Sequence, residues 1–442
     1  MAPAHGRDPL AMTKQFTPLD SPSREGSSTA EQSPIDVSTL EPATMGRGAL
    51  EGLRVLDVAT MMAGPWAATY LADYGADVVK AELPDKGDPV RQWGTQFDGT
   101  SLAWKGMARN KRLITLALNK PEGQKLLLRL LPKFDVCIEN FRPGVMERWG
   151  LGPARLHAVN PRLIILRTSG YGQTGPFAHK PGFGTLAEGF SGLSYITGAE
   201  DRPPVLAGYP LADGVAALTG AMAVLAAVYW RDVSGGTGQV IDNAITEATY
   251  RLIDYTMLDY EKRGIVRSRT GNRLGDLAPR NMYQTSDKHW VSISGGTQAI
   301  VERLFIAMGR PELIHDTRFT TNANRLVNVA ELDEIISEWM SRHALEDVLQ
   351  RCEDRGVAAA AVNDISQIAD HPQFRARNVL LRIDDPELGP TSTTHVHPRL
   401  SATPGGVRNL GGPLGRDNDS FYLGEVGLTE EEYREFQKAG AI

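Results

Sequence analysis

The chain has 442 residues, of which 53 are acidic and 47 are basic, and its net charge is −6. A chain of this length can bury a large core and should form about two or three domains. The near balance of charges argues against a general nucleic-acid binder and against a membrane-surface protein. The two cysteines, Cys137 and Cys352, are too few for a disulfide framework and fit a reducing compartment, so we expect a cytoplasmic protein.

The first 46 residues differ in composition from the rest of the chain. Residues 1–46 are rich in Ser, Pro, Thr and acidic residues and have no apolar periodicity, which predicts a disordered extension. They contain no apolar run typical of a signal peptide, and their acidic residues argue against an organellar transit peptide.

Short strands then alternate with helices. Residues 53–59 and 77–82 predict strands, and residues 63–75 predict a helix between them that begins with Gly-Pro. This βαβ pattern implies a parallel sheet. The pattern continues with a predicted helix at 121–131 and with predicted strands at 113–118, 134–139 and 162–167. We therefore predict an α/β fold with a doubly wound, Rossmann-like large domain.

The remaining patterns suggest how the chain is divided. We assign residues 47–235 to the large domain and residues 245–350, which are mostly helical in pattern, to a smaller α+β domain. Residues 356–442 are predicted to return to the large domain.

Ligands of a doubly wound sheet bind in the crevice beyond the carboxyl ends of its strands. The segments that follow the predicted strands there are 61–65, 83–91, 140–144 and 169–176. The first strand is not followed by a G-x-G-x-x-G fingerprint, so we expect no dinucleotide cofactor. The histidines are scattered without a nearby acid or cysteine to complete a cluster, so we expect no metal site.

One carboxylate, Asp213, precedes a long apolar run. From Val215 to Trp230 every side chain except Thr219 is apolar or Gly, which predicts a buried core helix rather than a membrane span. An Asp at this place has two explanations. It can cap the helix and stay ionised beside the helix dipole, or it can serve as a catalytic carboxylate.

Several motifs in fixed order resemble those of the class III coenzyme A transferases, which include formyl-CoA:oxalate CoA-transferase, carnitine CoA-transferase and α-methylacyl-CoA racemase. The similarity covers about residue 50 to the C-terminus. The motifs are Leu53-Arg-Val-Leu-Asp57, Ala63-Gly-Pro65, Gly75-Ala-Asp-Val-Val-Lys80, Asn110-Lys-Arg112, Glu139-Asn-Phe-Arg-Pro-Gly144, Gly170-Tyr-Gly172 and Leu211-Ala-Asp-Gly214.

The resemblance implies an interlocked homodimer that uses coenzyme A as a co-substrate, with no tightly bound cofactor. It implies that Asp213 is the nucleophile, which forms an anhydride with the donor acyl group and then an aspartyl-CoA thioester. Its substrates would be an acyl-CoA, with succinyl-CoA the favoured donor, and a small carboxylic acid. Positions matching CoA contacts are Met62, Ala63, Lys80, Leu83, Leu116, Asn119, Asn140, Phe141, Arg142, Arg148 and Gly184.

For three of these positions a structural explanation competes with CoA binding. Arg142 and Arg148 could form surface salt bridges, and Lys80 could be a solvated residue at the end of a strand.

The chain also departs from the family pattern. Formyl-CoA transferase has Gln at the position of Met62, Arg at that of Leu83 and Glu at that of Gly184, and its glycine-rich loop aligns with the Gly-poor segment 274–278. These differences argue against oxalate chemistry. Glu188, four residues after Gly184, lies on the same face of a helix and could restore the missing carboxylate, or it could be a surface residue.

Two alternatives to a transferase remain. A racemase or isomerase needs two acid/base groups, and the resemblance to that branch lacks its His because this chain has Phe183-Gly184. A non-catalytic partner subunit of a heteromeric transferase would account for the apolar Met62 and Gly184.

Overall fold

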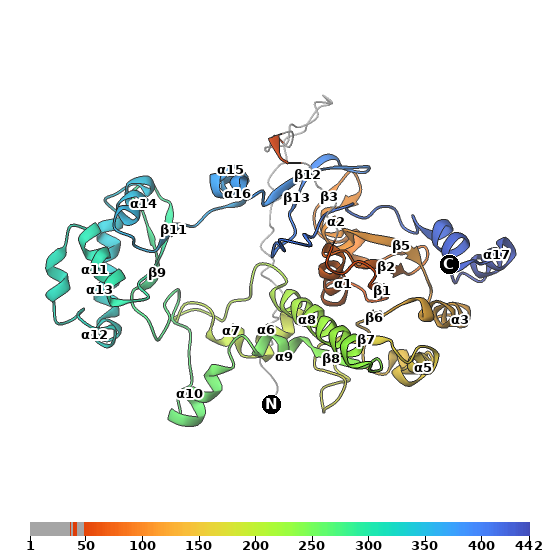
Figure 1. The fold of residues 1–442 in the computed structure, drawn as a ribbon. Helices are drawn as coiled ribbons and strands as arrows, with labels where there is room; N and C mark the ends of the chain where they lie inside the picture. The colour runs from red at the N-terminus through yellow and green to blue at the C-terminus, as the bar shows by residue number, and fades with distance from the viewer. Residues whose placement is uncertain (1–35, 37–38, 42–47) are drawn as a thin grey trace, which may run out of the picture.

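The computed structural model describes residue 36, residues 39–41 and residues 48–442 (Figure 1). The disordered extension predicted at 1–46 lies, apart from positions 36 and 39–41, outside the described residues.

The centre of the molecule is a parallel sheet of six strands. The strands are β1 (Arg54–Asp57), β2 (Asp77–Glu82), β5 (Lys111–Thr115), β6 (Val136–Glu139), β7 (Ile164–Ser169) and β8 (Val240–Ala244). Their order is β5-β2-β1-β6-β7-β8, and every neighbouring pair is parallel. The direction in which the chain crosses the sheet reverses between β1 and β6, which is the switch point where doubly wound sheets bind ligands. The predicted parallel α/β sheet is confirmed.

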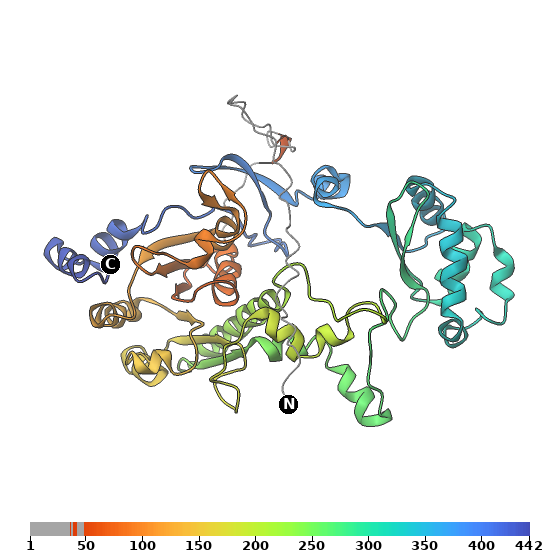
Figure 2. The same cartoon turned by 180° about the vertical axis from the view of Figure 1, so that it is seen from behind.

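Alternate residues of each strand face opposite layers of helices. Val55, Val136 and Ile164 pack with α1 (Ala63–Asp73) and α8 (Leu211–Ser234). Their chain neighbours Leu56, Cys137 and Ile165 pack on the other face, in a cluster with residues of α3 (Pro121–Leu130), α5 (Pro153–Val159) and α17 (Glu430–Lys438). The period of two along each strand places adjacent side chains on opposite faces, so helices cover both. The C-terminal helix α17 belongs to this part of the molecule (Figures 1 and 2).

Helix α8 differs from the buried helix that we predicted. Ala217 and Val224 are fully buried against α1 and the sheet, whereas Met222 and Tyr229 are 65% and 69% exposed. Among the described residues, only one side of the helix therefore packs against other elements. By length and composition α8 could also span a membrane, a test that core helices of globular proteins pass as well.

A second unit lies at the opposite end of the molecule from the C-terminal helix (Figure 2). Strands β9 (Arg280–Gln284), β10 (Trp290–Ser294) and β11 (Ala359–Ala361) form an antiparallel sheet in the order β11-β10-β9. Its apolar cluster runs from Ala278 to Val357 and includes residues of the four helices α11 (Gln298–Ala307), α12 (Asn322–Val327), α13 (Val329–Met340) and α14 (Leu345–Asp354).

The segment directly after β8 packs elsewhere. Ile245 and Ala248 of α9 (Ile245–Tyr250) form a cluster with Ala212 and Ala216 of α8. The first residues of the segment that we assigned to the small domain therefore lie against the large one.

The other helices are α2 (Leu102–Ala108), α4 (Val145–Arg148), α6 (Gly184–Phe190), α7 (Leu193–Ile196), α10 (Tyr255–Arg263), α15 (Ile365–Asp370) and α16 (Pro372–Ala376). Short strands β3 (Gln96–Phe97) and β4 (Thr100–Ser101) form one hairpin, and β12 (Leu380–Asp385) and β13 (Gly389–Thr394) form another. Tighter 3₁₀ turns occur at Pro89–Gln92, Leu131–Lys133 and Pro311–His315, and a π-helical turn occurs at Ser420–Val426.

Candidate active site

A cavity of about 570 Å³ opens at the carboxyl ends of the central strands. Residues 60–63 after β1, 140–143 after β6 and 168–170 at the end of β7 line one side of it. Helix α6, the loop 206–210 and Asp213 at the start of α8 line the other. The cavity therefore lies in the crevice where the topology of the sheet predicts a ligand.

Asp213 faces this cavity from the first turn of α8. The helix begins at Leu211 with Pro210 at the N-cap position, so the capping role considered for Asp213 is wrong. The backbone N–H of Gly184 acts on its carboxylate instead and lowers its pKa. The side chain is thus held at the positive end of a helix while it remains accessible from the cavity.

Gly184 lies directly against this carboxylate. A Cβ built on Gly184 would be 2.3 Å from Oδ2 and 2.8 Å from Cγ of Asp213. A side chain at position 184 would have to displace the carboxylate. The residue that we predicted as a CoA contact therefore lies directly against Asp213, in a space that a side chain would occupy.

Glu188 is a buried residue of the site. It follows Gly184 by one turn of α6, its side chain lines the cavity and the residue is only 4% exposed. Its Oε2 accepts a hydrogen bond of 3.1 Å from the backbone N–H of Ala207. The alternative of a surface glutamate is therefore wrong, and Glu188 connects α6 to the loop that leads into Asp213.

The surroundings of Asp213 alter its protonation. Its pKa is raised to about 6, chiefly by burial and also by the negative charge of Glu188, while the N–H of Gly184 acts to lower it. We expected an ordinary ionised carboxylate here. Asp213 is still mostly ionised at neutral pH, but it is a stronger base than a solvated Asp.

Two predicted residues, Asn140 and Phe141, shape the floor of the cavity. The amide of Asn140 accepts from the backbone N–H of Thr60 at 2.8 Å and donates to its carbonyl at 2.6 Å. The ring of Phe141 packs edge-on against Trp149 with 5.0 Å between ring centroids. Both residues border the cavity.

Two cations also line the cavity, the exposed residues Arg142 and Lys180. The ammonium group of Lys180 lies 3.3 Å from the centre of the Phe177 ring. Arg142 and Arg148 have no ion-pair partner within the described part of the chain, so the salt-bridge alternative is not seen for either. Arg148 does not line the cavity.

Four other predicted contacts lie outside the cavity. The side chain of Leu116 is 3% exposed in the core, and Leu83 and Asn119 are exposed outside the cavity. Lys80 is only 1% exposed, and its ammonium group lies 3.1 Å from Asp88. It is therefore neither the predicted CoA contact nor a solvated residue, because its charge is enclosed beneath the turn after β1.

A family model described as CoA-transferase family III matches residues 50–418. The chain belongs to CoA-transferase family III. This confirms the class of protein that the sequence motifs indicated, and it means that the chain is an enzyme of CoA transfer.

Relatives within CoA-transferase family III extend over nearly the whole chain. The chain is 42% identical over 394 residues to succinyl-CoA–D-citramalate CoA-transferase of Chloroflexus aurantiacus, covering 89% of this chain and 98% of that one. It is 39% identical over 397 residues to the beta subunit of succinyl-CoA–L-malate CoA-transferase of the same organism, covering 89% and 98%.

Solved structures of similar chains have the same fold. A CaiB/BaiF family protein from Brucella suis superposes with a TM-score of 0.75 at 31% identity and covers 85% of this chain and 99% of that one. A hypothetical protein from Mycobacterium tuberculosis superposes with a TM-score of 0.73 at 26% identity, covering 86% and 100%.

Some residues at this cavity are not predicted from the sequence. Lys180, Tyr209 and Thr168 line the cavity, and Asp88 supports its edge. Tyr209 and Lys180 lie in loops with no periodicity to mark them. For Asp88 the sequence does contain a signal. Charged residues, Asp57, Lys80 and Lys111, occur inside apolar strands, and because such residues are rarely buried without partners, they indicate that further charged side chains lie nearby.

Proposed function

We propose that the chain transfers CoA from succinyl-CoA to a small carboxylic acid, with Asp213 as the nucleophile. The observation that carries the proposal is the placement of the Asp213 carboxylate in the cavity, against a glycine that leaves it room and beside the backbone N–H of that glycine. The donor is supported by the relatives, whose names give succinyl-CoA as their substrate.

In the first half-reaction an oxygen of Asp213 attacks the thioester carbonyl of succinyl-CoA. The C–S bond breaks, CoA leaves as the thiolate, and a mixed anhydride of succinate and Asp213 remains. The thiolate then attacks Cγ of Asp213, which releases succinate and forms an aspartyl-CoA thioester. Each tetrahedral intermediate carries an oxyanion, which backbone N–H groups at the edge of the cavity can stabilise.

The second half-reaction repeats these steps with the acceptor. The carboxylate of the acceptor attacks Cγ of the aspartyl thioester, displaces the CoA thiolate and forms a second anhydride. The thiolate attacks the acyl carbonyl of the acceptor, giving the new acyl-CoA and regenerating the carboxylate of Asp213. No water or net proton is consumed. Water must be excluded during these steps because it would hydrolyse the anhydrides and the aspartyl thioester.

We infer that the acceptor is a small dicarboxylic acid. The two relatives named above act, by their names, on D-citramalate and L-malate. The cations that line the cavity, Arg142 and Lys180, could offset a second carboxylate or the phosphates of CoA. Glu188 acts in this scheme as a positioning residue that holds the 206–210 loop and raises the basicity of Asp213.

We further propose that the enzyme is a cytoplasmic, interlocked homodimer. The small unit lies well away from the central sheet, joined to it by extended segments (Figure 2). One face of α8 exposes Leu218, Met222, Tyr229 and Val233. Contiguous apolar surface of this kind is typical of a protein–protein interface. Light scattering on the purified chain measures the assembly, and a monomer would contradict this part of the proposal.

The two alternatives from the sequence remain testable. Asp213 and Glu188 provide two carboxylates in one cavity, which is the minimum that a racemase or isomerase requires. Exchange of the α-hydrogen of an acyl-CoA with deuterium in the absence of an acceptor would favour that activity.

The second alternative is a partner subunit of a heteromeric transferase. Because related chains are named as alpha and beta subunits, inactivity of the purified chain alone would favour a heteromer.

The test is a transfer assay with succinyl-CoA and a panel of monocarboxylic, dicarboxylic and hydroxydicarboxylic acids, followed by mass spectrometry of the CoA products. We expect a new acyl-CoA with at least one dicarboxylic acid. The Asp213→Asn variant should make none while it still binds CoA. Full activity of Asp213→Asn would contradict the proposal.

A further inference from the structure

The turn between β1 and α1 has an unusual backbone and unusual support. Thr60, Met61, Met62 and Ala63 all border the cavity that contains Asp213. Met61 has a φ of 65°, in the left-handed region that costs energy for a residue with a side chain. Something in the surroundings must hold it there.

The support comes from side chains rather than from secondary structure. The backbone N–H of Met61 donates to both carboxylate oxygens of Asp88, at 3.2 and 3.3 Å. The N–H of Ala59 donates to Asp57 at 3.1 Å, and both backbone groups of Thr60 bond to Asn140. The position of this turn therefore depends on a few polar side chains.

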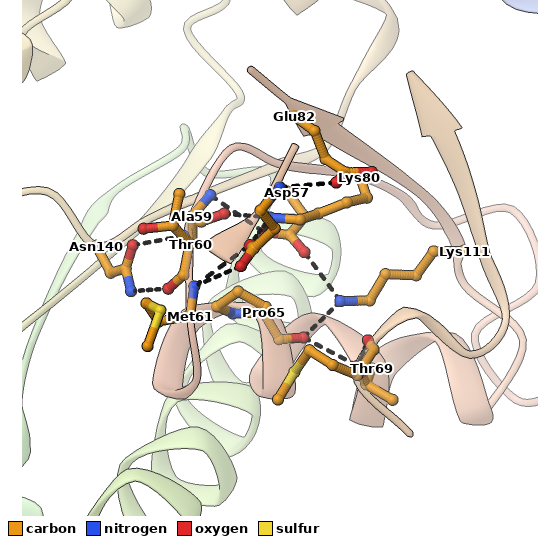
Figure 3. A network of polar contacts seen from close by, with 12 residues as sticks. Asp57, Ala59, Thr60, Met61, Pro65, Thr69, Lys80, Glu82, Lys111 and Asn140 are labelled. Atoms are coloured by element: carbon orange, nitrogen blue, oxygen red, sulfur yellow. Dashed lines mark hydrogen bonds and ion pairs between the residues drawn. The ribbon is translucent and has the colours of Figure 1, made fainter. Parts of the chain in front are cut away.

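Four buried charges connect these contacts, and Figure 3 labels three of them, Asp57, Lys80 and Lys111. Lys80 lies between Asp88 at 3.1 Å and Asp57 at 3.8 Å, and it donates to the carbonyl of Ala59. Lys111 pairs with Asp57 at 2.9 Å and donates to the carbonyl of Pro65, in the first turn of α1, at 2.6 Å. None of the four charged residues is more than 1% exposed. Two aspartates balance two lysines, so loss of one charge leaves another unpaired in the interior.

Asp88 has the most direct contact with the turn. Its carboxylate also accepts from the N–H of Val90 at 3.0 Å, which fixes the 3₁₀ turn at Pro89–Gln92. Its own N–H donates to Glu82 at 2.9 Å. The side chain is thus held from several sides, and both of its oxygens are used. An amide in its place would have one oxygen for three donors and would direct N–H groups at Lys80.

We propose that Asp88 is a positioning residue that holds Met61 in its left-handed conformation and so fixes the edge of the cavity at which the thioester carbonyl meets Asp213. This inference rests on the proposed function. Misplacement of an active-site edge by about 1 Å can cost about a hundredfold in rate, so the effect should be visible in the acylation of Asp213.

The test compares Asp88→Asn with Asp385→Asn. Asp385 is buried and pairs with Lys105 at 2.7 Å, but it lies outside the cavity, so the control removes an equivalent charge elsewhere. We expect Asp88→Asn to slow formation of the Asp213 adduct from succinyl-CoA by about 10- to 100-fold, and Asp385→Asn to leave it within about twofold. Equal rates in the two variants would overturn the inference. If Asp88→Asn does not fold, Asp88→Ser, which keeps a capping oxygen, takes its place.

A double-mutant cycle separates positioning from general damage. Glycine adopts a φ of 65° without strain, so in a Met61→Gly background the Asp88→Asn substitution should slow the reaction by less than about threefold. An undiminished loss in that background would contradict a role through Met61.

Hydrogen exchange gives a measurement that does not depend on activity. The Met61 amide should exchange faster in Asp88→Asn than in the parent protein, and Asp385→Asn should leave its exchange unchanged. Unchanged exchange in Asp88→Asn would overturn the inference. If the parent enzyme is active but forms no Asp213 adduct, the proposed function fails, whereas this exchange experiment still tests the role of Asp88.

Discussion

The carboxylate of Asp213 lies against the backbone of Gly184, so close that a Cβ on Gly184 would be 2.3 Å from its Oδ2. The N–H of Gly184 also acts to lower the pKa of that carboxylate. One residue thus leaves space for the proposed nucleophile and also influences its pKa. A larger residue at 184 would occupy the space that this chain gives to Asp213.

A methyl group at this position should disable the site. We expect Gly184→Ala to rotate the carboxylate of Asp213 and to lower the rate of acyl transfer by about a hundredfold, measured as kcat with succinyl-CoA. Gly189→Ala in the same helix is the control, since a Cβ on Gly189 would meet no atom within 4 Å. Equal kcat values in the two variants would show that the close contact has no functional role.

The pH dependence of acylation should follow the ionisation of Asp213. Only the carboxylate attacks the thioester, so the rate should rise with pH, reach half of its maximum near the pKa of about 6 and then level off. Glu188→Gln keeps an oxygen for the N–H of Ala207 but removes the charge that raises this pKa, so the profile should move to lower pH. The control Glu346→Gln should leave the pH profile unchanged. An unchanged profile in Glu188→Gln would contradict this explanation.

The same pKa predicts a stability effect. Because the pKa of Asp213 in the folded protein is about 6, above the ordinary value of 3.8, its contribution to stability is complete below about pH 4 and is lost as the pH rises through about 6. Asp213→Asn avoids this loss. Urea unfolding should therefore find it about 2–3 kcal/mol more stable than the parent at pH 7 and equally stable near pH 4. The exposed Asp201→Asn is the control, and no gain at pH 7 would refute the prediction.

The cation at the cavity rim should affect binding more than chemistry. Arg142 lines the cavity without an ion-pair partner among the described residues, so Arg142→Ala should raise KM for the acyl-CoA about tenfold and leave kcat within about twofold. The control is Arg155→Ala, which removes an exposed cation from α5 outside the cavity. Added salt should reduce the difference between Arg142→Ala and the parent. Unchanged KM would exclude Arg142 from CoA binding.

Much of the large domain was predictable because its signals are local. The strands that became β1, β2, β5, β6 and β7 are short apolar runs separated by helices, and this pattern is enough to predict a parallel sheet. The motif around Asp213 was likewise visible as one carboxylate beside an apolar helix. Family motifs then identified the class, which the match over residues 50–418 confirmed.

The errors have a common physical cause, since they depend on contacts between distant segments. Lys80 looks like a solvated residue at the end of a strand until Asp88 and Asp57 are placed around it. Glu188 is buried, and its carboxylate contacts the backbone of Ala207 in a loop that lies 19 residues further along the chain. The apolar run of α8 predicted burial on all sides, whereas the described part of the chain covers one side of the helix and leaves the other exposed. None of these contacts leaves a periodic signal in the sequence.

The central claim is that Asp213 carries the acyl group and then CoA. The most direct measurement is to mix the enzyme with succinyl-CoA, trap with hydroxylamine or borohydride, and locate the modified residue by mass spectrometry of peptides. We predict modification at Asp213, dependent on succinyl-CoA and absent from Asp213→Asn. An active enzyme whose Asp213 stays unmodified throughout turnover would contradict the account.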